Sequence, residues 1–133
     1  MEKTQHSEKL LLRKLDLLLR TGKLLMESAA DTSRIMRNMK RTAAYLGVPD
    51  EHLHIYINYN MLMVNLSDSE HSFSKFQRCE KHGINMTAIS AVSKLSWRAI
   101  REDYSLERYE EELENIRSRK RNYTSWQVAV GAG

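Results

Sequence analysis

Residues 53–66, which read LHIYINYNMLMVNL, decide the fold class because apolar residues alternate here with a period of two. The apolar positions are Leu53, Ile55 and Ile57, followed by Leu62, Val64 and Leu66. One continuous strand would place these two sets on opposite faces of a sheet. A turn at residues 58–60 restores a single apolar face, since asparagine tolerates positive φ. The segment therefore predicts a hairpin of two antiparallel strands.

The residues that follow the hairpin extend the prediction of a small sheet. Ser67-Asp68-Ser69 has the composition of a second turn. Residues 72–78 then predict a third strand at the edge of the sheet, although their alternation is poor. We expect a sheet of two or three strands.

A long amphipathic helix is predicted before the sheet, from about Ser7 to Ala29. Its main apolar stripe consists of Leu11, Leu15, Leu18, Gly22, Leu25 and Ala29, widened by Leu12, Leu19 and Met26. Charged residues from Lys9 to Glu27 occupy the other side. A glycine on the packed stripe permits close approach of a second helix or marks a break in this one.

The second helix has the clearest boundaries in the sequence. Asp31 is a good N-cap, because its carboxylate can accept hydrogen bonds from free amides of the first turn. Gly47 suits the left-handed position after the helix, and Pro49 prevents its continuation. The predicted inward face consists of Ile35, Met39, Ala43 and Leu46.

Two further helices are predicted after the sheet, capped by Asn85 and Ser105. The predicted inward face of the first is Ile84, Ala88, Val92, Leu95 and Ala99, and that of the second is Leu106, Tyr109, Leu113 and Ile116. Arg108 with Glu112, and Glu114 with Arg117, have the spacing of surface ion pairs. The order of elements predicts an α+β fold: two N-terminal helices, a small antiparallel sheet, and two C-terminal helices.

Composition is typical of one soluble domain, which we assign to residues 1–121. The chain has 133 residues, of which 41% are hydrophobic and 29% charged. A single cysteine, Cys79, excludes an internal disulfide and favours a reducing compartment. The first residues are polar and show no signal peptide. The net charge of +4 is modest and includes a C-terminal cluster, a distribution that does not favour nucleic acid as a partner.

No catalytic motif is present, and we predict neither an enzyme nor a cofactor. There is no nucleophile elbow, phosphate loop or dinucleotide fingerprint. His52 and His54 lie two apart on a predicted strand, so they are candidates for a shared metal site. Two histidines that face solvent explain the same spacing, and we favour that interpretation. Cys79 and His82 lie too close in sequence for the usual arrangement of a thiol protease.

The end of the chain has the pattern of a cytoplasmic segment that enters a membrane. The basic and aromatic residues of this membrane flank are Arg117, Arg119, Lys120, Arg121, Tyr123 and Trp126. An apolar run, 128–133, follows them. Positive charge followed by interfacial aromatic residues marks the cytoplasmic side of a span. We therefore interpret residues 122–133 as the start of a truncated first transmembrane helix, with the domain on the cytoplasmic face of the inner (cell) membrane.

Several stretches together resemble the N-terminal domain of the threonine/serine exporter family. They run from Gly22 through Ser28, Ala29, Thr32 and Arg34 to Gly47, and continue with 55–65, 84–95, 104–107 and the aromatic residues Tyr123 and Trp126. The family-motif residues are Gly22, Ser28, Ala29, Thr32, Arg34, Gly47, Asn85 and Leu95. Ala29-Ala30 stands where a glycine-alanine pair is usual in the family, and Ser93 where asparagine is common.

The resemblance implies the cytoplasmic α+β domain of a membrane exporter of threonine, serine or similar small metabolites, with a role in gating or assembly. A free-standing subunit that docks a separate membrane subunit is the first alternative, and a small hydrolase or metal-binding domain is the second. The expected partner is the membrane, reached through further helices or through that subunit. A homo-oligomer is compatible with either arrangement. The transported substrate does not follow from these residues.

Overall fold

The computed structural model describes the backbone of residues 2–132 and the side chains of residues 5–119. The elements, in chain order, are α1 (Glu2–Glu27), α2 (Thr32–Tyr45), the short 3-10 helix η1 (Asp50–His52), β1 (Leu53–Ile57), β2 (Met61–Ser67), β3 (Ser72–Arg78), α3 (Met86–Arg101) and α4 (Leu106–Ala132). Two helices, an antiparallel sheet and two helices confirm the predicted α+β fold. The first helix begins earlier and ends slightly earlier than expected.

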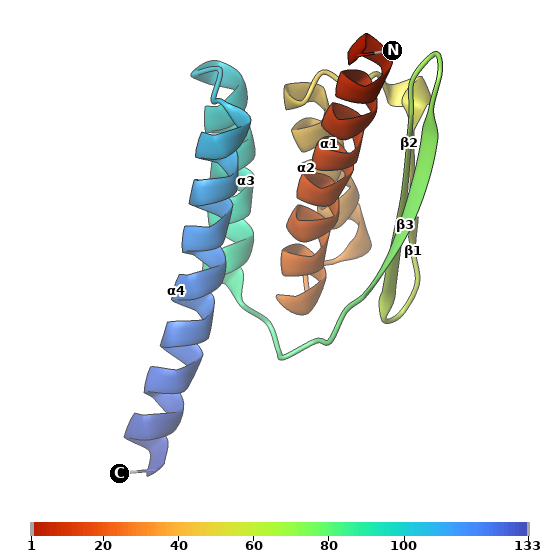
Figure 1. The fold of residues 1–133 in the computed structure, drawn as a ribbon. Helices are drawn as coiled ribbons and strands as arrows, with labels where there is room; N and C mark the ends of the chain where they lie inside the picture. The colour runs from red at the N-terminus through yellow and green to blue at the C-terminus, as the bar shows by residue number, and fades with distance from the viewer. Residues whose placement is uncertain (1, 133) are drawn as a thin grey trace.

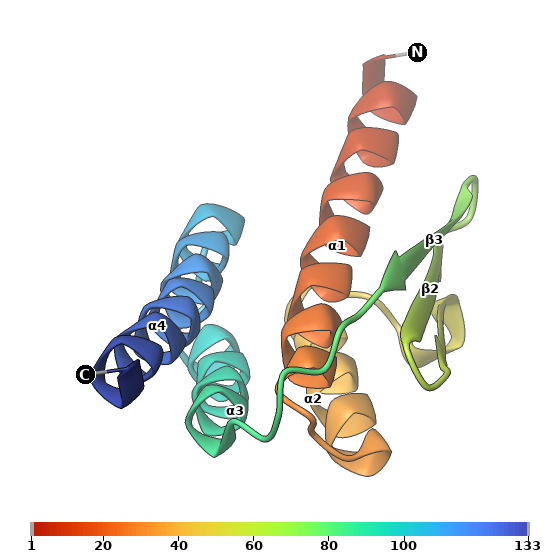
Figure 2. The same ribbon diagram turned by 90° about the horizontal axis from the view of Figure 1, so that it is seen from below.

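The elements form three layers. The sheet lies on one side, α1 and α2 form the middle layer, and α3 and α4 form the third (Figures 1 and 2). The helices of the middle layer therefore contact both the sheet and the outer helices. Burial from two sides requires a helix with more apolar surface than one stripe supplies.

The sheet has the order β1-β2-β3, and both neighbouring pairs are antiparallel. Leu53 pairs with Leu66 and Ile55 with Val64, so the apolar residues of both strands share the face that packs on α1 and α2. The hairpin closes where the amide of Asn58 donates to the carbonyl of Met61 at 2.8 Å. The predicted hairpin and the predicted third strand are both confirmed.

Asp68 forms the turn between β2 and β3. Its carboxylate accepts hydrogen bonds from the amides of Glu70 (2.8 Å) and His71 (2.6 Å). These bonds lower the pKa of Asp68, and the Glu70 amide makes the largest contribution. The turn runs from Asp68 to His71, slightly later than the expected position.

The helix α1 is buried more widely than one apolar stripe predicts. Leu17, Thr21 and Leu24 lie outside the predicted stripe, yet Leu17 and Thr21 are fully buried and Leu24 is 4% exposed. The prediction of one packed side was therefore wrong, because α3 and α4 cover a second side of this helix. The leucine-rich composition of residues 10–25 supplies the extra apolar surface.

All three predicted N-caps are confirmed. A side-chain oxygen of Asp31 accepts from the amide of Arg34 at 2.8 Å, and Asn85 and Ser105 do the same for the helices that follow them. Ile84 was wrongly assigned to the inward face of α3. It precedes the Asn85 cap and is 75% exposed, because the helical repeat begins only after the cap.

Three helices end in the same motif, in which an amide two residues beyond the helix cap donates to a carbonyl of the last turn. Ala30 donates to Leu25, Val48 to Ala43, and Tyr104 to Ala99, at 2.9–3.1 Å. The left-handed residues of these ends are Ala29 (φ 60), Gly47 (φ 76) and Asp103 (φ 49). Only α2 has glycine at this position, as its sequence predicted.

The left-handed positions at the ends of α1 and α2 predict opposite effects on stability for Gly-to-Ala and Ala-to-Gly substitutions. Gly47→Ala should lower the free energy of unfolding by about 1 kcal/mol, because a Cβ disfavours positive φ. No atom lies within 4 Å of that Cβ, so a clash makes no contribution. Ala29→Gly should raise the free energy of unfolding by up to about 1 kcal/mol. Urea unfolding followed by circular dichroism measures both, and a shift of the same sign in the two variants would contradict the explanation.

Candidate functional site

The first half of α4 is anchored in the core by a hydrogen-bonded tyrosine. Tyr109 is fully buried, and its hydroxyl lies 2.7 Å from Oγ1 of Thr21 and 3.4 Å from Oγ1 of Thr42. The Thr21 hydroxyl donates its only hydrogen to the carbonyl of Leu17, so Tyr109 must donate to Thr21. Thr42 then donates to Tyr109. One tyrosine thus joins α4 to both helices of the middle layer, and burial raises its pKa.

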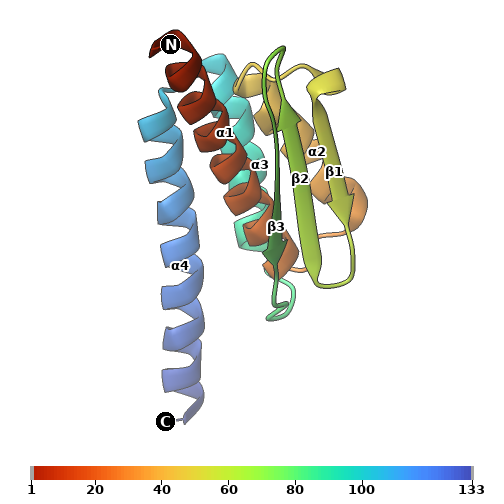
Figure 3. The same ribbon diagram turned by 45° about the vertical axis from the view of Figure 1, so that its right-hand side comes forward.

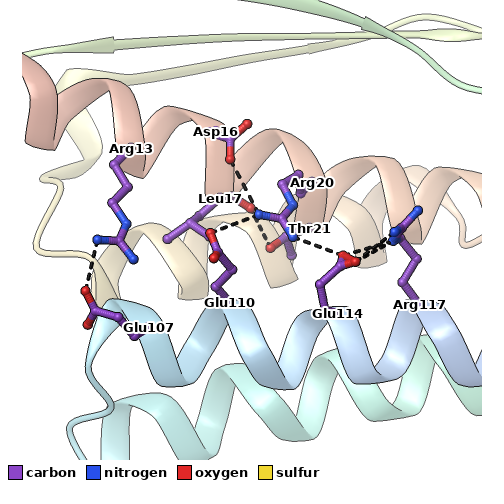
Figure 4. Close-up of polar contacts among 9 residues, drawn as sticks. All are labelled: Arg13, Asp16, Leu17, Arg20, Thr21, Glu107, Glu110, Glu114 and Arg117. Atoms are coloured by element: carbon purple, nitrogen blue, oxygen red, sulfur yellow. Dashed lines mark hydrogen bonds and ion pairs between the residues drawn. The ribbon is translucent and has the colours of Figure 1, made fainter.

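A row of ion pairs, the α1–α4 seam, runs along the surface beside this anchor (Figure 4). Arg13 pairs with Glu107 at 3.0 Å. Arg20 contacts Glu110 at 3.1 Å and Glu114 at 3.0 Å, and Asp16 of its own helix lies 3.6 Å away. The seam therefore links α4 to α1 through arginines at two positions of α1, Arg13 and Arg20.

The charges of the seam shift the pKa values of its members. Burial alone would lower the pKa of Arg20, but the hydrogen bond with Glu114 and the surrounding carboxylates raise it overall. The pKa of Glu114 is lowered, first by its hydrogen bond from Arg117 and then by Arg20. Both groups therefore stay charged over the physiological pH range.

Beyond the seam, α4 continues as one helix and projects past the other elements (Figures 1 and 3). Arg117 belongs to the seam through Glu114 at 2.7 Å, and Arg119 is exposed. The backbones of Lys120, Arg121, Tyr123 and Trp126 lie within α4, and their side chains lie outside the described residues. The proposed boundary between residues 121 and 122 falls inside this helix. Of the helices searched in the described part of the chain, none is long and apolar enough to cross a bilayer.

Comparison with known families accounts for most of the chain. Residues 16–133 match the model of the family ThrE, described as "Putative threonine/serine exporter". The chain belongs to the ThrE family. The family is one of transporters, which agrees with the resemblance seen in the sequence. Comparison with curated proteins and with solved structures gave no match.

The ThrE-motif residues predicted from the sequence do not form one cluster. Ser28 and Asn85 meet, because the amide of Asn85 donates to the carbonyl of Ser28 at 3.0 Å. Leu95 is fully buried, whereas Thr32 and Gly47 are exposed. The remaining motif residues are Gly22 in the core, Ala29 at the end of α1, and the half-exposed Arg34. The geometry gives most of these positions a role in caps, turns or packing.

The histidine pair does not have the geometry that strand periodicity predicts. His52 ends the 3-10 helix η1, and only His54 lies on β1, so strand periodicity does not place the two side chains on one face. Within the described residues, no three His, Cys, Asp or Glu side chains are grouped to hold a metal ion. Burial raises the pKa of Cys79 to about 11, which keeps the thiol protonated at neutral pH and disfavours nucleophilic chemistry.

Sequence reasoning missed the cross-helix partners of Arg20, Thr21 and Tyr109. These side chains are separated from their partners by 67–94 positions. Thr21 offered one signal, since it lies between two leucines, Leu17 and Leu24, on the side assigned to solvent. Tyr109 was correctly placed inward, but its hydroxyl partner was not predicted.

Gly22 predicts a measurable effect of overpacking. A Cβ there would lie 2.5 Å from Cδ2 of Leu62 and 2.8 Å from Sδ of Met39. Overpacking costs about 1–3 kcal/mol, and the better helix propensity of alanine offsets about 1 kcal/mol. Gly22→Ala should therefore lower the free energy of unfolding by about 1 kcal/mol. In a double-mutant cycle, Gly22→Ala should lower the free energy of unfolding less in the Met39→Ala background than in the wild type. An equal loss in both backgrounds would show that Met39 does not limit the space.

The seam predicts a stability effect that depends on pH. Arg20→Gln should lower the free energy of unfolding by about 1 kcal/mol at pH 7, because Arg20 joins three carboxylates. The pKa of Glu114 is lowered in the folded state, so its contribution is present above the usual value of 4.5 and is lost as pH falls below it. The difference from the wild type should therefore shrink in acid.

Arg108→Gln is the matched control for this measurement, because the ion pair that Arg108 forms among the described side chains is with Glu112 of its own helix. Urea unfolding at pH 7 and at pH 3 measures both variants. Arg108→Gln should lower the free energy of unfolding less than Arg20→Gln does. If both substitutions have the same effect at pH 7, the seam adds nothing to the attachment of α4.

Proposed function

We propose that this chain is the cytoplasmic front domain of a ThrE-family exporter of threonine, serine or similar small metabolites, and that it acts in gating or assembly. The observation that carries the proposal is the continuity of α4. One helix, Leu106–Ala132, runs from the packed core through the membrane flank. In this proposal, residues 122–133 form the start of the first transmembrane helix.

A continuous helix can transmit motion only if its packed end is held firmly, and three kinds of contact support this: apolar burial, a hydrogen bond and ion pairs. Tyr109 and Leu113 bury the apolar side of α4, and Tyr109 is hydrogen-bonded to the middle layer. Arg13 and Arg20 fix its polar side through the α1–α4 seam. A rotation of the domain would therefore move the projecting part of α4 with it.

The residue order of the projecting part supports a membrane on the far side of the flank. Basic residues 117–121 are followed by Tyr123 and Trp126, and then by the apolar run 128–133. Basic residues favour the cytoplasmic side, and aromatic rings favour the interface. In this proposal the chain itself carries no catalytic function.

The test interrupts α4 in the complete exporter and measures export of labelled threonine and serine from cells. Insertion of Gly-Gly-Ser between Ser118 and Arg119 should reduce export toward that of a protein lacking residues 1–120. The residues N-terminal to the insertion keep their packing, but α4 no longer transmits the position of the domain to the residues that follow. The same three residues inserted between Asp68 and Ser69, in the exposed β2–β3 turn, should leave export unchanged.

Export that is unaffected by both the α4 insertion and the deletion would remove any essential role for the domain. The alternative of a free-standing docking subunit predicts a different result. In that case the chain supplied from a separate gene should restore export to the deletion strain. Coupling through a continuous α4 predicts no restoration, because the helix must be covalently joined to the membrane part.

A further inference from the structure

The helices α2 and α3 pack against each other, and together they form a strongly basic surface. Neither helix contains an aspartate or a glutamate. Their cations are Arg34, Arg37, Lys40 and Arg41 of α2, and Lys94, Arg98 and Arg101 of α3. The whole chain has a net charge of only +4, so these two helices are more basic than the rest.

Arg41 lies at the centre of this surface and is held by neutral groups. Its Nη1 lies 3.2 Å from Oδ1 of Asn38 and 3.1 Å from Oγ of Ser96, and the ring centroid of Trp97 is 4.1 Å from its guanidinium carbon. Oγ of Ser93 is also within reach, at 3.4 Å. The guanidinium is thus fixed in place without a carboxylate.

Further cations surround Arg41. Arg37 precedes it by one helical turn on α2, and burial followed by the charge of Arg37 lowers the pKa of Arg41. On α3, Lys94 and Arg101 lie one turn before and one turn after Trp97. We define the α2–α3 basic face as Arg37, Arg41, Lys94, Trp97 and Arg101.

In the described part of the chain, the cations of this face are not paired with acids. Among the described side chains, no carboxylate lies within 4.0 Å of a cation of the α2–α3 basic face. Four acids of α4, in contrast, already pair with arginines: Glu107, Glu110, Glu112 and Glu114. Like charges one turn apart on a helix are destabilising. An external anion would relieve this repulsion.

The chemistry of the face favours a phosphate compound. Guanidinium groups bind phosphate through two parallel hydrogen bonds, and adjacent arginines recognise groups that carry several negative charges. Arg41 is already oriented by Ser96 and Trp97, so less side-chain entropy is lost on binding. The side chain of Trp97 is 55% exposed, so a bound anion would change its surroundings.

We propose that the α2–α3 basic face is a binding site for a soluble polyphosphate anion. A soluble ligand is favoured over a lipid because α3 runs alongside α4 (Figures 1 and 3). The α2–α3 basic face is therefore directed away from the axis of α4 to one side, and not along the direction in which α4 projects. The site is separate from the membrane flank and does not depend on the proposed function of α4.

Tripolyphosphate is the probe, and the fluorescence of Trp97 is the readout. The chain has two tryptophans, so Trp126→Phe leaves Trp97 as the single reporter. Titration with sodium tripolyphosphate should give a saturable change in emission that weakens as salt is added. The double variant Arg37→Gln/Arg41→Gln should bind at least about tenfold more weakly, because a hydrogen bond to a charged group contributes more than one factor of ten.

The matched control is Lys75→Gln/Arg78→Gln on β3, which removes the same charge from another surface and should bind as the parent does. Circular dichroism checks that both double variants are folded. A linear, unsaturable response, or an equal loss of affinity in both double variants, would overturn the proposal. Flotation with phosphatidylglycerol and phosphatidylcholine vesicles covers the lipid alternative. If Arg37 and Arg41 affect binding to anionic vesicles while tripolyphosphate does not bind, the face is a lipid site and the proposal is wrong.

Discussion

The structure depends on the burial of α1 between two layers. Leu62 of β2 reaches this helix from one side and Tyr109 of α4 from the other, and both are fully buried. Gly22 allows the close approach on the sheet side, where even a methyl group would clash. The leucine-rich sequence of α1 follows from this position, because a helix covered on two sides must be apolar over most of its circumference.

The polar side chains that attach α4 to this core have hydrogen-bond partners. Thr42, Tyr109 and Thr21 form a continuous series of hydrogen bonds that ends at the carbonyl of Leu17. A buried hydroxyl without a hydrogen-bond partner is costly. This series of hydrogen bonds therefore favours one rotation and one position of α4 against the core. The ion pairs of the seam add the same constraint at the surface. This double attachment supports the proposal that α4 couples the domain to a membrane span.

The charges of the molecule divide between two surfaces. Along α1 and α4, acidic and basic side chains form ion pairs that join the two helices. On α2 and α3 there are no acids, and Arg41 is held by serine, asparagine and tryptophan side chains. The first surface stabilises the fold and the second leaves positive charge available for a ligand. The two proposals for this protein therefore rest on different helices and can be tested separately.

The sequence alone determined the features that depend on neighbouring residues. The hairpin followed from the shift in alternation between Ile57 and Leu62, and the helix ends from Asp31, Asn85 and Gly47. The family also followed from the order of short motifs. The membrane flank is equally a matter of residue order, and its role is still a prediction. Strand periodicity failed for His52, because a 3-10 turn precedes the strand.

Only the tertiary structure decided which residues meet across the layers. Arg20 and Glu114, or Arg41 and Ser96, lie far apart in the sequence, and no local pattern records such a pair. The second buried side of α1 was hidden for the same reason, since periodicity shows which residues are apolar but not how many layers cover them. The basic face arises because packing places two helices without acids side by side. Local propensity thus fixes the elements, and the packing of three layers fixes the surfaces that they share.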